Sequence, residues 1–122
     1  MKDMYEYKAK LDRVIDADTI DVIVDLGFYT KIKERLRLAG IDAPEVYGVK
    51  KGSREYLKGV EAKDFVEKRL KENNDEMIIK TDKVGKYRRW IAEIFLGDSK
   101  KTLNQELVEQ GFAVEEIGRA HV

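Results

Sequence analysis

The first third of the chain alternates apolar and polar residues with a period of two, and this pattern constrains the fold most. Over residues 19–26, Ile, Val, Val and Leu occupy every second position, with Thr and Asp among the residues between them. The runs 5–12 and 31–38 alternate in the same way. Successive side chains of a strand point to opposite faces, so these runs predict half-buried β-strands. Gly27-Phe28 predicts a tight turn, and the three strands should form an antiparallel meander.

The remainder of the chain predicts a helix, two strands and a second helix. Apolar side chains recur on one helical face over residues 60–72 and again over 101–110, where Gly111 supplies a stop signal. Two further strands are expected at 77–79 and 90–96. Five short strands with a helix after the third predict a mainly β fold with α. The expected form is a five-stranded Greek-key β-barrel of the OB type, with a helix between strands 3 and 4 and a C-terminal helix.

The composition excludes several classes of chemistry. Lys and Arg number 24, as do Asp and Glu, so the net charge is zero and coating of nucleic acid through bulk charge is excluded. Cysteine is absent and His121 is the single histidine, which excludes zinc–thiolate sites and disfavours a histidine base. An enzyme of this composition would work with carboxylates, cations and an oxygen-ligated metal.

The length of 122 residues predicts one domain, 1–122, with residues 117–122 as a flexible tail. No apolar run reaches the ~18 residues of a membrane-spanning helix. The first residues lack the apolar stretch of a secretory signal. We therefore expect a cytoplasmic protein without a membrane partner, or the mature form of an exported one. Nothing in the sequence demands more than a monomer.

Paired carboxylates mark two predicted junctions of strand and loop. Asp16 and Asp18 lie just before one strand, and Asp42 and Glu45 lie just after another. Carboxylates, a backbone carbonyl and water are the ligands that Ca²⁺ prefers. Asp16 and Asp18 are equally typical of turn residues that bond their own backbone. Asp42 could also be an ordinary start of a loop.

Basic residues stand near these acids. Arg37 is on the strand that leads into Asp42, and Arg89 begins a late strand. A guanidinium can bind two phosphate oxygens, but either arginine could equally be a solvated strand residue paired with neighbouring acids. Lys50 and Lys51 lie in a long glycine-containing segment that we expect to be an ordered loop from residue 39 to 59. They could contact phosphates or simply be solvated.

The run Lys86-Tyr87-Arg88-Arg89-Trp90 interleaves cations with aromatic rings, inside or beside a polar loop. Such a pattern suits phosphates and stacked bases. Trp90 is in phase with the apolar positions of the strand that follows, which favours a core position for it. Tyr87 is the better candidate for stacking.

In combination and order, these pieces resemble the staphylococcal nuclease (thermonuclease) family. The resemblance runs from about residue 11 to 114. It implies an OB-fold barrel and calcium-dependent hydrolysis of phosphodiester bonds in DNA and/or RNA, with single strands favoured. The matching stretches are 14–19, 36–45, 59–62, 86–89 and 103–113.

The resemblance also implies a metal site. Asp18 and Asp42 match the family's two calcium-ligating carboxylates. Ala43 stands where the family supplies a backbone carbonyl, and a carbonyl ligand survives a change of side chain. Asp16 matches an acid just behind the metal, and Thr19 accompanies it.

For catalysis, Glu45 matches the general base, and Arg37 and Arg89 match two phosphate-binding arginines. The chemistry is self-consistent, because a carboxylate can deprotonate water and two arginines can neutralise the developing charge without a histidine. The positions that match substrate contacts are Lys50, Lys51, Lys86 and Tyr87.

The sequence departs from the family at two places and in its net charge, because the best-known member is strongly basic and this chain is neutral. It also leaves other functions open. Arg88 replaces a residue that is commonly glycine, and residues 114–118 lack the tyrosines that flank the nucleotide pocket in the best-known member. The main alternative is a non-catalytic OB module that binds nucleic acid or a protein. A plain calcium-binding domain is a third. A complete set of catalytic residues favours the nuclease.

Overall fold

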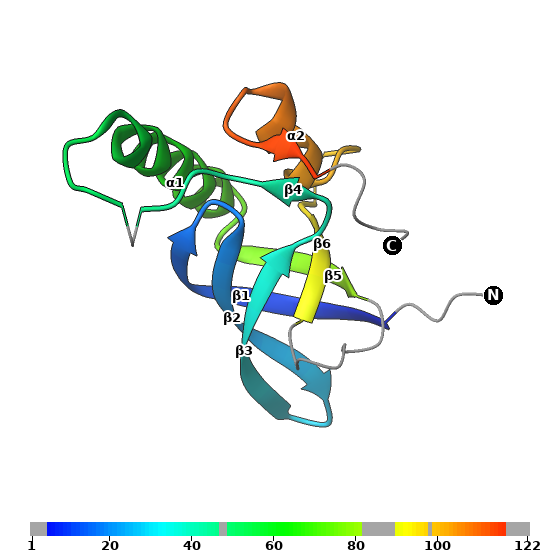
Figure 1. The fold of residues 1–122 in the computed structure, drawn as a ribbon. Helices are drawn as coiled ribbons and strands as arrows, with labels where there is room; N and C mark the ends of the chain where they lie inside the picture. Colours follow the sequence, from blue (N-terminus) through cyan, green and yellow to red (C-terminus); the bar gives the residue numbers. More distant parts are fainter. Residues whose placement is uncertain (1–4, 47–48, 82–89, 98, 117–122) are drawn as a thin grey trace, which may run out of the picture.

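The computed structural model describes residues 5–46, 49–81, 90–97 and 99–116. Five strands close into a barrel in the order β1-β2-β3-β6-β5 (Figure 1). All pairings are antiparallel except that of β3 with β6, which is parallel. The expected antiparallel meander of the first three strands is therefore confirmed. The barrel strands are β1 (Tyr5–Asp16), β2 (Thr19–Gly27), β3 (Thr30–Leu38), β5 (Glu76–Thr81) and β6 (Trp90–Phe95).

Two helices lie at one end of the barrel, and the tip of the β2–β3 hairpin lies at the opposite end (Figure 1). The first, α1 (Arg54–Glu72), falls between the third and fourth barrel strands, and the second, α2 (Leu103–Glu109), follows the last. This confirms the predicted barrel with a helix after its third strand and a C-terminal helix. Neither described helix is long and apolar enough to cross a membrane.

The core fills the barrel with the apolar residues of the alternating strands. Ile20, Val22 and Val24 of β2 are fully buried, and so is Leu36 of β3. Burying each such side chain stabilises the fold by roughly 1.5–3 kcal/mol. Trp90 packs against this core, as its phase predicted.

Helix α1 begins six residues earlier than the predicted range of 60–72. Ser53 caps the helix by accepting a hydrogen bond from the Tyr56 amide at 3.2 Å. Gly59, which suggested a loop, is instead a buried helical residue. The predicted loop of residues 39–59 is therefore shorter, and its last part is helical.

A small second sheet was not predicted. It pairs β4 (Ile41–Asp42) with β7 (Val114–Glu115) in antiparallel fashion. Strands of two residues carry no readable alternation, so sequence patterning could not find them. This sheet holds the chain beyond α2 against the segment that carries Asp42.

Helix α2 is shorter than the predicted range of 101–110, because Thr102 caps it in a reciprocal arrangement with Gln105. Gly111 follows with φ +81°, as expected of a residue that stops a helix. The predicted tail of residues 117–122 and the loop of residues 82–89 lie outside the described residues.

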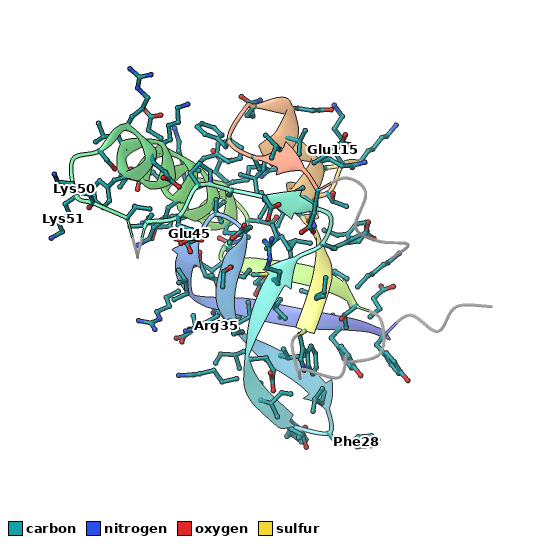
Figure 2. All side chains as sticks on the ribbon, in the orientation of Figure 1. Phe28, Arg35, Glu45, Lys50, Lys51 and Glu115 are labelled. Atoms are coloured by element: carbon teal, nitrogen blue, oxygen red, sulfur yellow. The ribbon has the colours of Figure 1, made fainter. Side chains whose placement is uncertain are left out.

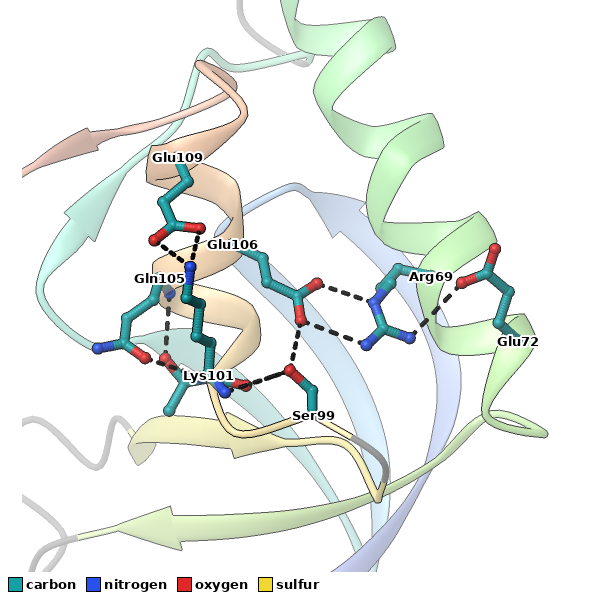
Figure 3. A network of polar contacts seen from close by, with 8 residues as sticks. Arg69, Glu72, Ser99, Lys101, Gln105, Glu106 and Glu109 are labelled. Carbon is teal, nitrogen blue, oxygen red and sulfur yellow. Dashed lines mark hydrogen bonds and ion pairs between the residues drawn. The ribbon is translucent and has the colours of Figure 1, made fainter.

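The two helices are joined by a polar network (Figure 3). The Arg69 guanidinium of α1 donates to both Glu106 oxygens of α2, at 2.8 and 3.2 Å. Both side chains are less than one-fifth exposed. Ser99 donates to the same carboxylate at 3.1 Å. A charge-assisted bond in such a place stabilises the packing of the helices by about 1.5–3 kcal/mol.

The β2–β3 turn contains a strained pair. Phe28 and Tyr29 have φ values of 55° and 63°, and both side chains are fully exposed. The left-handed conformation costs about 1–2 kcal/mol per residue with a side chain, and Asn-Gly is the pair that such a turn favours.

We expect Phe28→Asn with Tyr29→Gly to raise the free energy of unfolding by about 1–2 kcal/mol, measured by urea denaturation. Alanine at both positions retains the strain and should give no such gain; an equal gain would refute the explanation.

Candidate active site

The β1–β2 turn positions a nearly buried carboxylate. Asp18 is 8% exposed, and its Oδ1 accepts a hydrogen bond from the Thr19 hydroxyl at 3.0 Å. Its Oδ2 accepts one from the Ala43 amide at 2.9 Å. Its own carbonyl accepts one from the Leu38 amide at 2.8 Å. Asp18 therefore joins the turn to the end of β3 and to the residue after β4.

Asp16 holds the same loop at a second point. Its Oδ1 accepts a hydrogen bond from the Val46 amide at 2.8 Å. These carboxylates thus bind the backbone of residues 43 and 46, on either side of Pro44-Glu45. The interpretation of Asp16 and Asp18 as turn residues bonded to their own backbone does not account for these contacts.

Arg37 lies between two of the predicted metal ligands. It faces Thr19 in the β2–β3 register. Its Nη1 lies 2.7 Å from Asp18 Oδ2, and its Nη2 donates to Asp42 Oδ1 at 2.5 Å. The side chain is 20% exposed. Arg37 is thus paired with acids, as one interpretation held, but it is not a freely solvated strand arginine.

The guanidinium of Arg37 retains the capacity to donate. Its buried Nη1 makes no aligned hydrogen bond within the described residues, although it is near enough to Asp18 for strong attraction. We therefore treat the Arg37–Asp18 contact as an ion pair rather than a hydrogen bond. Because Nη1 is buried, a phosphate oxygen would have to approach the guanidinium from the exposed fifth of the side chain.

Glu45, three residues after Asp42, is exposed. No hydrogen bond or ion pair joins its carboxylate to another residue in the described part of the chain. Its backbone is pressed against α1, since a Cβ on Gly59 would lie 2.6 Å from the Glu45 carbonyl oxygen. The loop is therefore fixed at three points, while the side chain it presents remains available.

The possible metal ligands are all oxygen atoms. Asp18 and Asp42 contact the same guanidinium, and Ala43 follows directly. Among the residues that the structure describes, no cluster of three or more His, Cys, Asp or Glu side chains could hold a metal ion. A cation here would therefore need backbone carbonyls and water to complete its shell. Hard cations such as Ca²⁺ accept such a set.

Of the remaining predicted site residues, the structure describes only Lys50 and Lys51, and it does not bring them to this group. Lys50 and Lys51 are exposed near the start of α1, and Figure 2 shows them well apart from Glu45. Lys86, Tyr87 and Arg89 lie outside the described residues.

Comparison with known proteins identifies the family. The model of the staphylococcal nuclease homologue family matches residues 35–121. The chain belongs to the staphylococcal nuclease family. The matched range of this family includes Arg37, Asp42, Glu45 and Arg89, whereas Asp18 precedes it.

Two curated relatives, both named as nucleases, extend the similarity. The chain is 35% identical to a thermonuclease of Staphylococcus intermedius over 83% of its length, and spans 55% of that protein. It is 31% identical to the endonuclease YhcR of Bacillus subtilis over 88% of its length, but spans only 9% of that much longer protein.

A second charged cluster, which sequence reasoning missed, lies two residues further along β2 and β3, where Asp21 pairs with Arg35. Asp21 of β2 is 8% exposed and accepts hydrogen bonds from Arg35 at 2.8 and 3.2 Å and from Arg13 at 3.2 Å. Hydrogen bonding from Arg35 holds the pKa of the Asp21 carboxyl below its usual value. The register places Asp21 opposite both arginines. The alternation of charges on neighbouring strands was the available signal.

Asp21 should make stability depend on acid pH. A lowered folded-state pKa contributes stability that is present above the unfolded value of about 4 and is lost as pH falls through the folded value. We expect Asp21→Asn to lower the free energy of unfolding at neutral pH by about 1 kcal/mol, because both arginines are more than half exposed. The difference should narrow below about pH 4. Asp64→Asn, on exposed α1 surface, is the control, and a pH-independent difference would contradict the assignment.

Gly59 should be intolerant of a side chain. An alanine in a helix normally stabilises by about 1 kcal/mol relative to glycine. Here the new Cβ would meet the backbone of Glu45. We expect Gly59→Ala to destabilise by about 1–3 kcal/mol, measured by urea denaturation, while exposed Glu61→Ala changes stability by less than about 0.5 kcal/mol. A Gly59→Ala protein of unchanged or greater stability would show that the contact does not constrain the loop.

Proposed function

We propose that the chain is a metal-dependent nuclease, favouring Ca²⁺, that hydrolyses phosphodiester bonds in DNA and/or RNA. The observation that carries this proposal is the Arg37 guanidinium held between Asp18 and Asp42, with the exposed Glu45 three residues after Asp42 in a loop that Asp16 and Asp18 hold. Membership of the nuclease family supports it. The names of the relatives, an endonuclease and a thermonuclease, point to the same reaction.

Glu45 acts as the general base. Its carboxylate accepts the proton of the attacking water as the oxygen approaches phosphorus. The three contacts that fix its loop hold the Glu45 backbone in place, which lowers the conformational entropy lost when its carboxylate engages the water. Asp16 and Thr19 take part as positioning residues, because each bonds a group that holds the loop or Asp18.

Arg37 binds the non-bridging oxygens of the scissile phosphate. The guanidinium stabilises negative charge as it develops on those oxygens, and Asp18 and Asp42 hold it in place beforehand. Arg89, which precedes β6 in the sequence, fulfils the same role in this proposal. This division of work requires neither histidine nor cysteine.

Asp18, Asp42 and the backbone carbonyl of Ala43 would hold the cation. When bound there, Ca²⁺ supplies Lewis-acid polarisation of a phosphate oxygen and positions water. Lys50, Lys51, Lys86 and Tyr87 bind the flanking nucleotides of a single strand. The protein works as a monomer.

Digestion of single-stranded DNA and RNA, with Ca²⁺ and with chelator, tests this function. We expect calcium-dependent cleavage, lowered on the order of 10²–10³-fold in kcat by Arg37→Ala, because a positioned charge donor is lost. Glu45→Gln should lower kcat comparably while oligonucleotide binding persists. Glu67→Gln, the same substitution on the exposed surface of α1, is the matched control.

Cleavage that is indifferent to chelator and to both substitutions would contradict the proposal. Oligonucleotide binding without cleavage would favour the non-catalytic OB module. Calcium binding with neither cleavage nor oligonucleotide binding would favour a plain calcium-binding domain.

A further inference from the structure

A row of cations continues along β3 from the candidate active site. Lys31, Lys33 and Arg35 alternate with half-buried or buried residues, so they share one face of the strand with Arg37. Alternate residues of a strand are ~6.7 Å apart. This spacing is close to that of successive phosphates in an extended single strand.

A second row lies two strands away on the same face. In the register, β2 residues Asp21 and Asp25 pair with Arg35 and Lys31 on one side, and with Arg13 and Lys8 on the other. Because β1 and β3 lie on either side of β2 and neighbouring strands are ~4.8 Å apart, the two rows are ~10 Å apart. We call these six exposed side chains the basic ladder: Arg35, Lys33 and Lys31 of β3, with Arg13, Lys10 and Lys8 of β1.

A groove of about 670 Å³ lies at the end of the basic ladder that is farther from Arg37. Lys8, Lys10 and Lys31 line it together with half-buried Ile23 and Phe95. An apolar surface that includes an aromatic ring, bordered by lysines, suits a base whose phosphate is bound at the edge.

The ladder keeps an excess of positive charge in a chain whose net charge is zero. Both Arg13 and Arg35 share the single carboxylate of Asp21, and their side chains remain 64% and 56% exposed. Lys33 is 66% exposed beside Asp12 at 3.5 Å. The described carboxylates on this face, fewer than the six cations, are Asp12, Asp21, Asp25, Glu76 and Glu6, and Glu6 is paired with Lys80 outside the ladder.

We propose that the basic ladder binds the sugar-phosphate backbone of single-stranded nucleic acid on one side of the scissile bond. This inference rests on the proposed nuclease function, because Arg37 is both the upper end of the β3 row and the binder of the reacting phosphate. Figure 2 shows Arg35 between Glu45 and the hairpin tip at Phe28, so the strand would leave the site toward that tip. Lys50 and Lys51 lie in a different direction from Glu45.

The separation of the rows favours one backbone over two. A single strand fits between rows ~10 Å apart, with phosphates at the lysines and bases over Ile23 and beside the Phe95 ring, over which the Lys80 ammonium lies 4.8 Å from the centroid. The rigid duplex would contact one row of the ladder and could not place bases in the groove. The sequence of the strand would have little influence, since phosphates and stacking carry no base code.

The test compares two triple variants by fluorescence anisotropy with labelled oligothymidylates of about 4 and about 16 nucleotides, a range that covers OB-fold site sizes. Chelator is present so that no cleavage occurs. The ladder variant is Lys10→Ala, Lys31→Ala and Lys33→Ala. Its matched control, with the same change of net charge on other exposed surface, is Lys68→Ala, Lys71→Ala and Lys100→Ala. Circular dichroism confirms that both variants fold.

We expect the wild type and the control to bind the longer oligonucleotide on the order of tenfold more tightly than the ladder variant does. The dependence of log affinity on log salt should fall by about 2 in the ladder variant, because three phosphate contacts are lost at ~0.7 each. Equal affinities and equal salt slopes in both triple variants would overturn the proposal. So would a stronger effect of the ladder variant on anionic lipid vesicles than on the oligonucleotide.

The two proposals can fail separately. If the wild type cleaves no substrate but binds the oligonucleotide through the ladder, the nuclease proposal fails and the ladder stands. If the wild type cleaves in a calcium-dependent manner while both triple variants bind alike, the ladder is wrong and the nuclease proposal stands.

Discussion

The Asp18 carboxylate is the interaction on which the candidate site depends. It is nearly buried, and a buried charge is costly unless charges and donors surround it. Arg37, Thr19 and the Ala43 amide provide that compensation from β3, β2 and the segment after β4. The barrel thus tolerates the acid only with these three partners in place. The requirement that stabilises Asp18 also determines where Arg37 and the loop beyond Ala43 must lie.

That constraint reaches Glu45 through the backbone rather than through side-chain contacts. The loop is bound by Asp18 and Asp16 at one face and meets Gly59 of α1 at the other. The packing of α1 on the barrel therefore also determines where the Glu45 backbone lies. A change that moves α1 would move Glu45, even though no described residue bonds its carboxylate. Stability and catalytic geometry are coupled here by a close approach of two backbones.

Sequence patterns sufficed where a feature is local and repeated. Alternation predicted the first three strands. The resemblance grouped Asp18, Arg37 and Asp42, and in the fold the Arg37 guanidinium contacts both carboxylates. Patterns failed where the cause is tertiary. The early start of α1 was missed because Gly59 suggests a loop in the sequence. Only the fold shows that a glycine is needed there, where the helix approaches the Glu45 backbone. The β4–β7 sheet is too short to alternate, and the enclosure of Arg37 depends on acids from two other elements. The roles of Arg89, Lys86 and Tyr87 stay predictions.

A net charge of zero conceals the arrangement that matters for a polyanion. The net charge sums the residues of both faces of every strand. In β3, however, alternation places the cations on one face and the apolar residues on the other. Asp21 then does more than neutralise, since one carboxylate orients two arginines and leaves them more than half exposed. Because screening confines attraction to about 10 Å at ordinary salt, a polyanion at the ladder senses these cations and not the distant acids of α2. A neutral protein of this fold can therefore hold a strand beside its site without attracting nucleic acid over its whole surface.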